Sequence, residues 1–197
     1  MNKYHFIKDE MLVHTPICTH KNPKKILVVG GCDNIKEELK KHNTITETLF
    51  IDAKVALSEF KRFNGARDYD VAIVATDEFA KDRDFWIELT KLLDTKAVVS
   101  SVISNIIIEE DSAKEELEVV GKIYPIVMPY RYDSQKDGEL LSSYLLLSSR
   151  FYHPTADINL QRADLTDGFR YYNSDIAISA FTVPTFIFKN YLGIIKR

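Results

Sequence analysis

The chain lacks long hydrophobic runs and is poor in cysteine, and each absence narrows the class of protein. No apolar stretch approaches the roughly 20 residues that a membrane-spanning helix needs, so we expect no membrane partner. The first residues, Met-Asn-Lys-Tyr-His-Phe-Ile-Lys-Asp-Glu, contain no apolar segment typical of a signal peptide. The two cysteines, Cys18 and Cys32, favour reduced thiols in a cytoplasmic protein over a disulfide framework.

An excess of basic residues is also absent. The chain has 26 Lys and Arg against 29 Asp and Glu, which gives a formal net charge of −3. Because nucleic-acid binding depends mainly on Lys and Arg, this balance argues against nucleic acid as a partner. The length of 197 residues and the hydrophobic content of 45% fit one globular domain over residues 1–197.

Short β-rich runs alternate with helical segments along the chain. This alternation predicts a mostly parallel sheet covered by helices on both faces, which is a doubly wound α/β fold. We expect the last strand to be antiparallel at an edge of the sheet, and the tail from Ala156 onward to form helices on that sheet. Strands are expected at 25–29, 46–51, 70–76, 97–103, 122–128 and 138–149. Helices are expected at 9–20, 34–41, 55–63, 85–93 and 114–120.

Two segments far apart in the sequence carry the most specific pattern. Residues 170–184 read Arg-Tyr-Tyr-Asn-Ser-Asp-Ile-Ala-Ile-Ser-Ala-Phe-Thr-Val-Pro. Residues 10–16 read Glu-Met-Leu-Val-His-Thr-Pro, and residues 20–31 continue with His-Lys-Asn-Pro-Lys-Lys-Ile-Leu-Val-Val-Gly-Gly. In order and separation, both segments resemble signatures of the spermidine synthases, the polyamine aminopropyltransferases. The resemblance implies a Rossmann-like sheet of the class I methyltransferase type.

The resemblance also implies an activity. Members of this family transfer an aminopropyl group from decarboxylated S-adenosylmethionine to putrescine, giving spermidine and methylthioadenosine. The expected partners are therefore small molecules, a nucleoside sulfonium and a diamine, and the sulfonium is a co-substrate, so no cofactor is expected. The family pattern also allows a homodimer. Because only nine residues precede Glu10, where relatives usually have a small β-domain, the resemblance covers only their catalytic domain.

Gly30 and Gly31 follow the first predicted strand, where ligands bind in doubly wound sheets. Glycines let the backbone turn tightly and approach a ligand closely. Asp33 either caps the next helix or accepts hydrogen bonds from a ligand amine. The Gly-x-Gly-x-x-Gly fingerprint of dinucleotide sites is absent, which argues against NAD. By the resemblance, this loop lines the amino-acid-derived end of the sulfonium, with Cys32 and Asn34 at two family glycine positions.

Recognition of the nucleoside departs from the family pattern. The family's ribose-binding Glu corresponds to Phe50, which accepts no hydrogen bond. Asp52 lies two residues further on and therefore faces the same side of the strand. It either binds the ribose hydroxyls, as a carboxylate can, or caps the following helix. The family's Asp-Gly segment at the adenine is shortened here, because Phe63 is followed almost directly by the strand at 70–76.

The reaction needs a general base, because free amines are mostly protonated at neutral pH. Ala75 stands at the family's catalytic Asp position, so Asp77 is the candidate base and Glu78 the alternative. The alternative is that Asp77 and Glu78 lie at the start of a helix, where negative side chains interact favourably with the helix dipole. Together with Phe50, Ala75 supports a second hypothesis of a catalytically degenerate relative that binds a nucleoside or polyamine without turnover. A class I methyltransferase shares the sheet but leaves the tail motif unexplained.

Three further side chains match family positions around the amine pocket. They are His14, Tyr124 and Tyr130. The spacing of His14, Cys18 and His20 is loosely metal-like, but the paired cysteines of zinc sites are missing, so we expect no metal. The Arg-Tyr-Tyr run at 170–172 is expected to fasten the tail to the sheet.

Overall fold

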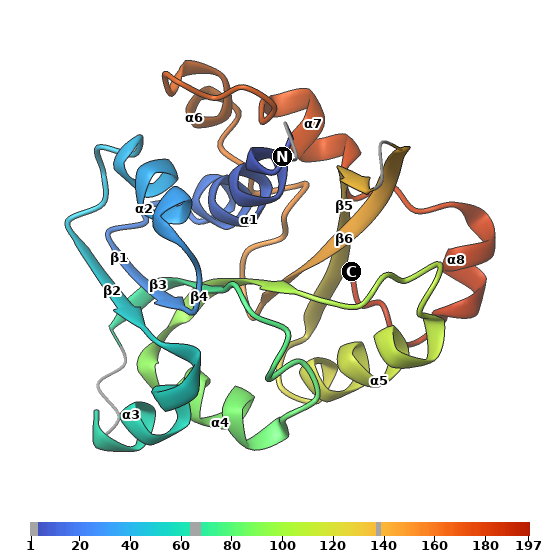
Figure 1. Ribbon diagram of the computed structural model, residues 1–197, viewed down its shortest axis with the longest axis horizontal. Coiled ribbons are helices and arrows are strands. Elements are labelled where there is room, and N and C mark those ends of the chain that lie inside the picture. Colours follow the sequence, from blue (N-terminus) through green and yellow to red (C-terminus); the bar gives the residue numbers. More distant parts are fainter. Residues whose placement is uncertain (1–3, 64–67, 137–138) are drawn as a thin grey trace.

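The computed structural model describes residues 4–63, 68–136 and 139–197, and six strands within these ranges form one mixed sheet (Figure 1). Their order across the sheet is β2-β1-β3-β4-β6-β5. The first four strands in the chain pair in parallel, and β6 runs antiparallel to both β4 and β5. The strands are β1 (Lys25–Val29), β2 (Glu47–Ile51), β3 (Tyr69–Val74), β4 (Leu93–Val102), β5 (Ile126–Lys136) and β6 (Glu139–Ser149).

Helices cover both faces of the sheet, which confirms the predicted α/β class. Apolar side chains alternate between the two faces along β1, with Ile26 and Val28 packed on one side and Leu27 and Val29 on the other. One face carries α1 (Phe6–Thr19), α2 (Asp33–Lys40), α6 (Leu160–Leu165) and α7 (Ser174–Ser179). The other carries α3 (Ala56–Arg62), α4 (Arg83–Leu92), α5 (Glu110–Gly121) and α8 (Thr185–Asn190).

The antiparallel strand lies at a different position from the one predicted. β6 is antiparallel, as expected, but it is inserted between β4 and β5, so β5 is the edge strand. The buried run Tyr144–Ser149 explains this, because a strand that is apolar on both faces is stabilised in the interior of a sheet. The tail protects the β5 edge: Val127 and Lys196 exchange two backbone hydrogen bonds, of 2.9 and 3.0 Å.

The tail also holds α1, which is buried from Glu10 to its end. The Arg162 guanidinium donates to the carbonyl oxygens of Ile17 (2.6 Å), His20 (2.8 Å) and Lys21 (3.0 Å). Ile17 lies in the last turn of α1, and His20 and Lys21 follow its end, so a cation there binds carbonyls at the helix terminus and complements the dipole. The predicted packing of the tail is therefore only partly on the sheet, because much of it packs on α1.

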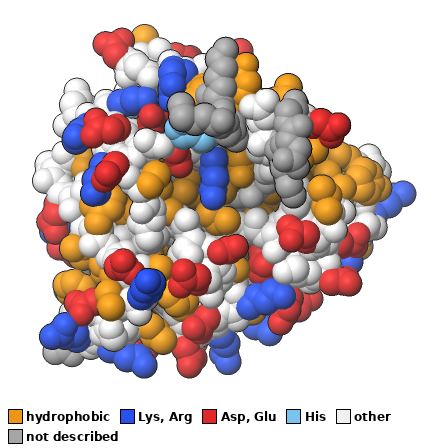
Figure 2. Space-filling view, viewed as in Figure 1, with side chains coloured by type: hydrophobic (Ala, Val, Ile, Leu, Met, Phe, Trp, Pro, Cys, Tyr) orange, Lys and Arg blue, Asp and Glu red, His pale blue; other side chains and the backbone are white. Residues whose placement is uncertain are grey.

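Charges on the surface are mixed. On the face seen in Figure 2, Lys and Arg side chains are interspersed with Asp and Glu, in keeping with the small net charge. None of the described helices has the length and apolarity needed to cross a bilayer.

Candidate functional site

A cleft of about 370 Å³ opens at the ends of β1, β2 and β3, and we call it the strand-end cleft. This is the edge of the sheet where doubly wound folds bind their ligands. Four of the predicted site residues line it together, namely Gly30, Gly31, Asp52 and Glu78. The rest of the lining consists of Lys36, Phe50, Ile51, Ala53 and Thr76.

The two glycines line this cleft in a backbone conformation that is unfavourable for residues with a Cβ. Their φ angles are +70° at Gly30 and +94° at Gly31, both in the region that favours glycine. The N–H of Gly30 donates to the Ile51 carbonyl (2.8 Å), which fixes the turn against the end of β2. A Cβ on Gly31 would lie 3.0 Å from the Ile35 side chain, so the backbone turns here without room for a larger residue.

Asp52 lies at the cleft and also performs the alternative role that was predicted for it. Its Oδ1 accepts the N–H of Lys54 (2.8 Å) and so caps the short 3₁₀ turn Ala53–Val55. Oδ2 has no partner among the described residues and the side chain is exposed to the cleft. One carboxylate oxygen is therefore held in place and the other is available to a ligand hydroxyl.

The two candidate bases are separated by the turn after β3. Glu78 lines the strand-end cleft, and its N–H donates to the Thr76 hydroxyl (3.2 Å). Asp77 is exposed and does not line the cleft. The alternative prediction, that these acids begin a helix, is wrong, because α4 begins at Arg83 and is capped by Asp82.

Lys36 and Phe50, which both line the cleft, form a cation–π contact that was not predicted from the sequence. The Lys36 ammonium lies 5.4 Å from the centre of the Phe50 ring and binds Asp33 (2.8 Å). The hydrogen bond from Lys36 lowers the pKa of Asp33. Asp33 is the first residue of α2, Cys32 occupies the N-cap position, and Asp33 does not line the cleft.

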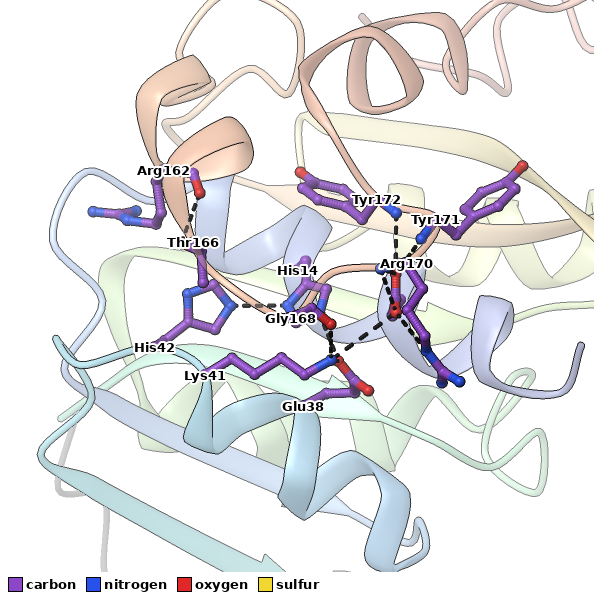
Figure 3. Close-up of polar contacts among 11 residues, drawn as sticks. His14, Glu38, Lys41, His42, Arg162, Thr166, Gly168, Arg170, Tyr171 and Tyr172 are labelled. Atoms are coloured by element: carbon purple, nitrogen blue, oxygen red, sulfur yellow. Dashed lines mark hydrogen bonds and ion pairs between the residues drawn. The ribbon is translucent and has the colours of Figure 1, made fainter.

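His14 lies away from the cleft, in a buried polar group that we call the α1–tail cluster (Figure 3). Its Nε2 is 2.9 Å from Glu38 Oε2, and its Nδ1 is 2.8 Å from His42 Nε2. Both contacts are satisfied if His14 donates to the Glu38 carboxylate and accepts from the N–H of His42. The members of the cluster are Glu10, His14, Glu38, Lys41 and His42.

Burial governs ionisation in this cluster. It lowers the pKa of His14, opposed by the hydrogen bond to Glu38, and it lowers the pKa of His42 to about 3. Burial alone would raise the pKa of Glu38, but hydrogen bonds from His14 and Lys41 outweigh it and lower that pKa. The arrangement that follows is a carboxylate next to two neutral imidazoles.

The same cluster joins the two sequence signatures to each other. The buried Glu10 carboxylate accepts the backbone N–H groups of Arg170 (3.1 and 3.2 Å), Tyr171 (2.8 Å) and Tyr172 (3.0 Å). These residues do fasten the tail, as predicted. Their backbone binds α1, and the Tyr171 hydroxyl donates to Asp133 of β5 (3.0 Å) in the sheet.

The two predicted tyrosines lie in the core and not at the strand-end cleft. The Tyr130 hydroxyl donates to the Met11 carbonyl (3.2 Å) and lies 2.6 Å from the Ser100 hydroxyl, between the sheet and α1. Tyr124 is buried on the opposite face, before the start of β5, with Arg150 above its ring. The structure therefore does not bring them together with Asp52 and Glu78.

Several residues of the cleft and the cluster have only a weak sequence signal. Thr76 is the second residue after β3, and Lys36 lies in the first turn of the helix after the glycines, positions that face the strand ends. Glu38 and His42 are four residues apart, which places them on one side of a helical turn.

Within the described ranges, no three His, Cys, Asp or Glu side chains come together as a metal site.

The chain is similar to known proteins over most of its length. Residues 5–64 match the family model of the spermine/spermidine synthase domain. A polyamine aminopropyltransferase of Helicobacter acinonychis is 26% identical over 219 residues, which cover 97% of this chain and 77% of the relative. One of Clostridium beijerinckii is 26% identical over 223 residues, covering 94% and 78%.

Solved structures agree on the fold. A spermidine synthase in complex with the transition state analogue AdoDATO superposes with a TM-score of 0.80 at 22% identity, covering 97% of this chain and 76% of the other. The spermidine synthase of Thermotoga maritima gives 0.78 at 21% identity with the same coverage. The chain is thus similar in sequence to polyamine aminopropyltransferases over most of its length, and it shares the fold of the spermidine synthases.

Proposed function

We propose that this chain transfers an aminopropyl group from decarboxylated S-adenosylmethionine to putrescine, giving spermidine and methylthioadenosine. The observation that carries the proposal is the strand-end cleft, in which Gly30, Gly31, Asp52 and Glu78 face one space. The co-substrate supplies the reacting group, so the proposal includes no cofactor. The unpaired thiols of Cys18 and Cys32 fit a cytoplasmic site for this reaction.

The charges of the cleft favour a cationic nucleoside. Asp52 and Glu78 are acidic, whereas the ammonium of Lys36 is already paired with Asp33. A sulfonium near Glu78 is therefore attracted, and the free oxygen of Asp52 accepts the ribose hydroxyls. The glycine turn admits the aminopropyl chain against the backbone, where no Cβ blocks it.

Glu78 is the stronger candidate for the base. The Glu78 carboxylate accepts a proton from the putrescine ammonium, and the neutral amine then attacks the aminopropyl carbon next to the sulfonium. The carbon–sulfur bond breaks, and its electron pair stays on sulfur as neutral methylthioadenosine. The new secondary amine stays protonated as an ammonium ion, and Glu78 gives the proton that it accepted to solvent. Asp77 is assigned no step, because its side chain lies outside the cleft lining.

A second candidate function is binding without turnover. Two observations favour it: Phe50 lines the cleft at the family's ribose-binding position, and Ala75 stands at the position of the catalytic acid. In this case the cleft holds a nucleoside or a polyamine, and Glu78 is only an electrostatic contact.

A product assay separates the two functions. The protein is incubated with decarboxylated S-adenosylmethionine and putrescine, and methylthioadenosine and spermidine are measured by mass spectrometry. We expect both products from the wild type, a loss of about 100-fold in rate for Glu78→Gln, and less than a twofold change for the matched control Asp77→Asn. Absence of product from folded protein refutes the transferase, and equal loss in both variants refutes the role of Glu78.

A further inference from the structure

A second hollow of about 470 Å³ adjoins the strand-end cleft, between α2 and the edge strand β2. We call it the side hollow. Lys36 and Phe50 line both spaces, so the two hollows lie side by side and share these two side chains as a wall. Its volume lies within the usual range for small-molecule sites, about 300–1,000 Å³. A ligand that reaches Asp52 therefore lies next to Phe50 and the side hollow.

The side hollow exists because β2 has a neighbour on only one side. β2 pairs with β1 at one edge and is the last strand of the sheet at the other. Thr46, Thr48 and Phe50 alternate with the residues that face α3, so their side chains point to the α2 side. There α2 covers only part of them, and Thr48 and Phe50 remain half-buried.

The lining of the side hollow suits a flat heterocycle with a polar edge. The Phe50 ring lines the hollow, and a cation, the Lys36 ammonium, lies 5.4 Å from its centre. Leu39 and Ile45 add apolar walls. The Asn43 amide and the Thr48 hydroxyl also line the hollow, and neither has a hydrogen-bond partner among the described residues. These groups offer donors and acceptors to the edge of a base.

The spacing along β2 fits a nucleoside. Phe50 and Asp52 are two residues apart on one side of an extended chain, so their side chains are displaced by about 6.6 Å. That is close to the offset between the sugar hydroxyls and the base in a nucleoside. We propose that the purine base stacks on Phe50 and enters the side hollow, with its polar edge towards Asn43 and Thr48, while Asp52 holds the ribose.

This inference rests on the proposed function for the identity of the base, and it assigns Phe50 a role in place of a carboxylate. Stacking on an aromatic ring contributes substantially to binding of a base and does not require a specific hydrogen bond. The half-buried Phe50 thereby replaces part of the affinity that is lost without a second acid at the ribose. The same geometry makes Thr48 and Asn43 the residues that discriminate among bases.

Calorimetric titration of the purified protein with methylthioadenosine, and with 5-methylthioribose as a probe without the base, tests the proposal. We expect Phe50→Leu to weaken methylthioadenosine binding about tenfold and to leave methylthioribose binding unchanged. The matched control is Phe151→Leu, since Phe151 is an exposed ring with the Lys96 ammonium 4.6 Å from its centre. In the wild-type complex, nuclear Overhauser contacts are expected between the adenine protons and the Thr48 methyl group.

The outcomes distinguish this inference from the proposed function. Unchanged methylthioadenosine affinity in Phe50→Leu overturns the inference, as does absence of the contacts to Thr48, and both leave the product assay unaffected. Failure of the folded wild type to bind methylthioadenosine also overturns the inference, and spermidine formation then decides the transferase separately. If Phe50→Leu does not fold, the contacts to Thr48 in the wild type remain decisive.

Discussion

The buried carboxylate of Glu10 allows a sharp test of what holds the tail to the body of the protein. Glu10→Gln keeps the size of the side chain and removes its charge. The amide oxygen can still accept the N–H groups of Tyr171 and Tyr172. The amide nitrogen then occupies the place of Oε1, so the N–H of Arg170 loses its 3.1 Å contact there and keeps only the one at 3.2 Å, to the oxygen in the place of Oε2.

The magnitude follows from these contacts. A hydrogen bond to a charged acceptor contributes about 1.5–3 kcal/mol, and one to a neutral acceptor roughly half as much. One of the four contacts is lost and the other three, now to a neutral oxygen, are weakened, so we expect Glu10→Gln to lower the free energy of unfolding by about 2–4 kcal/mol. For a chain of this size, the melting temperature should fall by roughly 5–15 °C.

Urea denaturation at pH 7.5, followed by circular dichroism, measures this change. Glu37→Gln is the control, because Glu37 is an exposed acid whose ion pair with Lys40 (2.7 Å) should contribute about 0.5 kcal/mol or less. Arg170→Ala is a second control: Glu10 binds its backbone, and its exposed guanidinium lies 3.6 Å from the carboxylate. A loss below about 1 kcal/mol for Glu10→Gln, equal to that of the controls, would falsify this account of the tail.

Three further predictions concern other parts of the fold. Gly31→Ala should destabilise the protein by about 1–2 kcal/mol, measured by urea denaturation, because its φ of +94° is unfavourable with a Cβ. Burial lowers the pKa of His42 from 6.5 to about 3, so the folded state favours the neutral ring and its stability is fully present only above pH 6.5. Between pH 7.5 and 5, this ring should cost about 2 kcal/mol of unfolding free energy, and His42→Gln should remove that dependence in the same titration. Arg162→Met should lower stability by about 2–4 kcal/mol, since three carbonyls at the end of α1 lose a charged donor; an unchanged melting temperature would refute the cap.

The sequence predicted the class of fold but not the order of every strand. Alternating runs reveal which segments are strands, and β1 was found at the predicted residues Lys25–Val29. The sheet order depends on which strand can be buried on both faces, a property of the assembled layers. For that reason β6 was expected at the edge, and β5, expected at 122–128, begins only at Ile126.

For the candidate site, too, the sequence predicted the position of some residues and not of others. Gly30, Gly31, Asp52 and Glu78 follow strand ends, and parallel pairing alone brings strand ends together, so position in the sequence was enough to place them at one cleft. His14 lies elsewhere because its partners, Glu38 and His42, are 24 and 28 residues away and were not recognisable as partners from sequence.

The contact between Glu10 and the Arg-Tyr-Tyr run has a consequence for how the protein is made. The residues that meet there are 160–162 positions apart in the chain. At a synthesis rate of about 5–20 residues per second, α1 leaves the ribosome roughly 8–32 s before its partner does. During that interval its apolar side, later covered by the tail, is exposed to solvent and to other nascent chains. The nascent chain is thus most prone to aggregate before the tail with the Arg-Tyr-Tyr run is synthesised. Chaperones that bind nascent chains should have their largest effect on folding in that period.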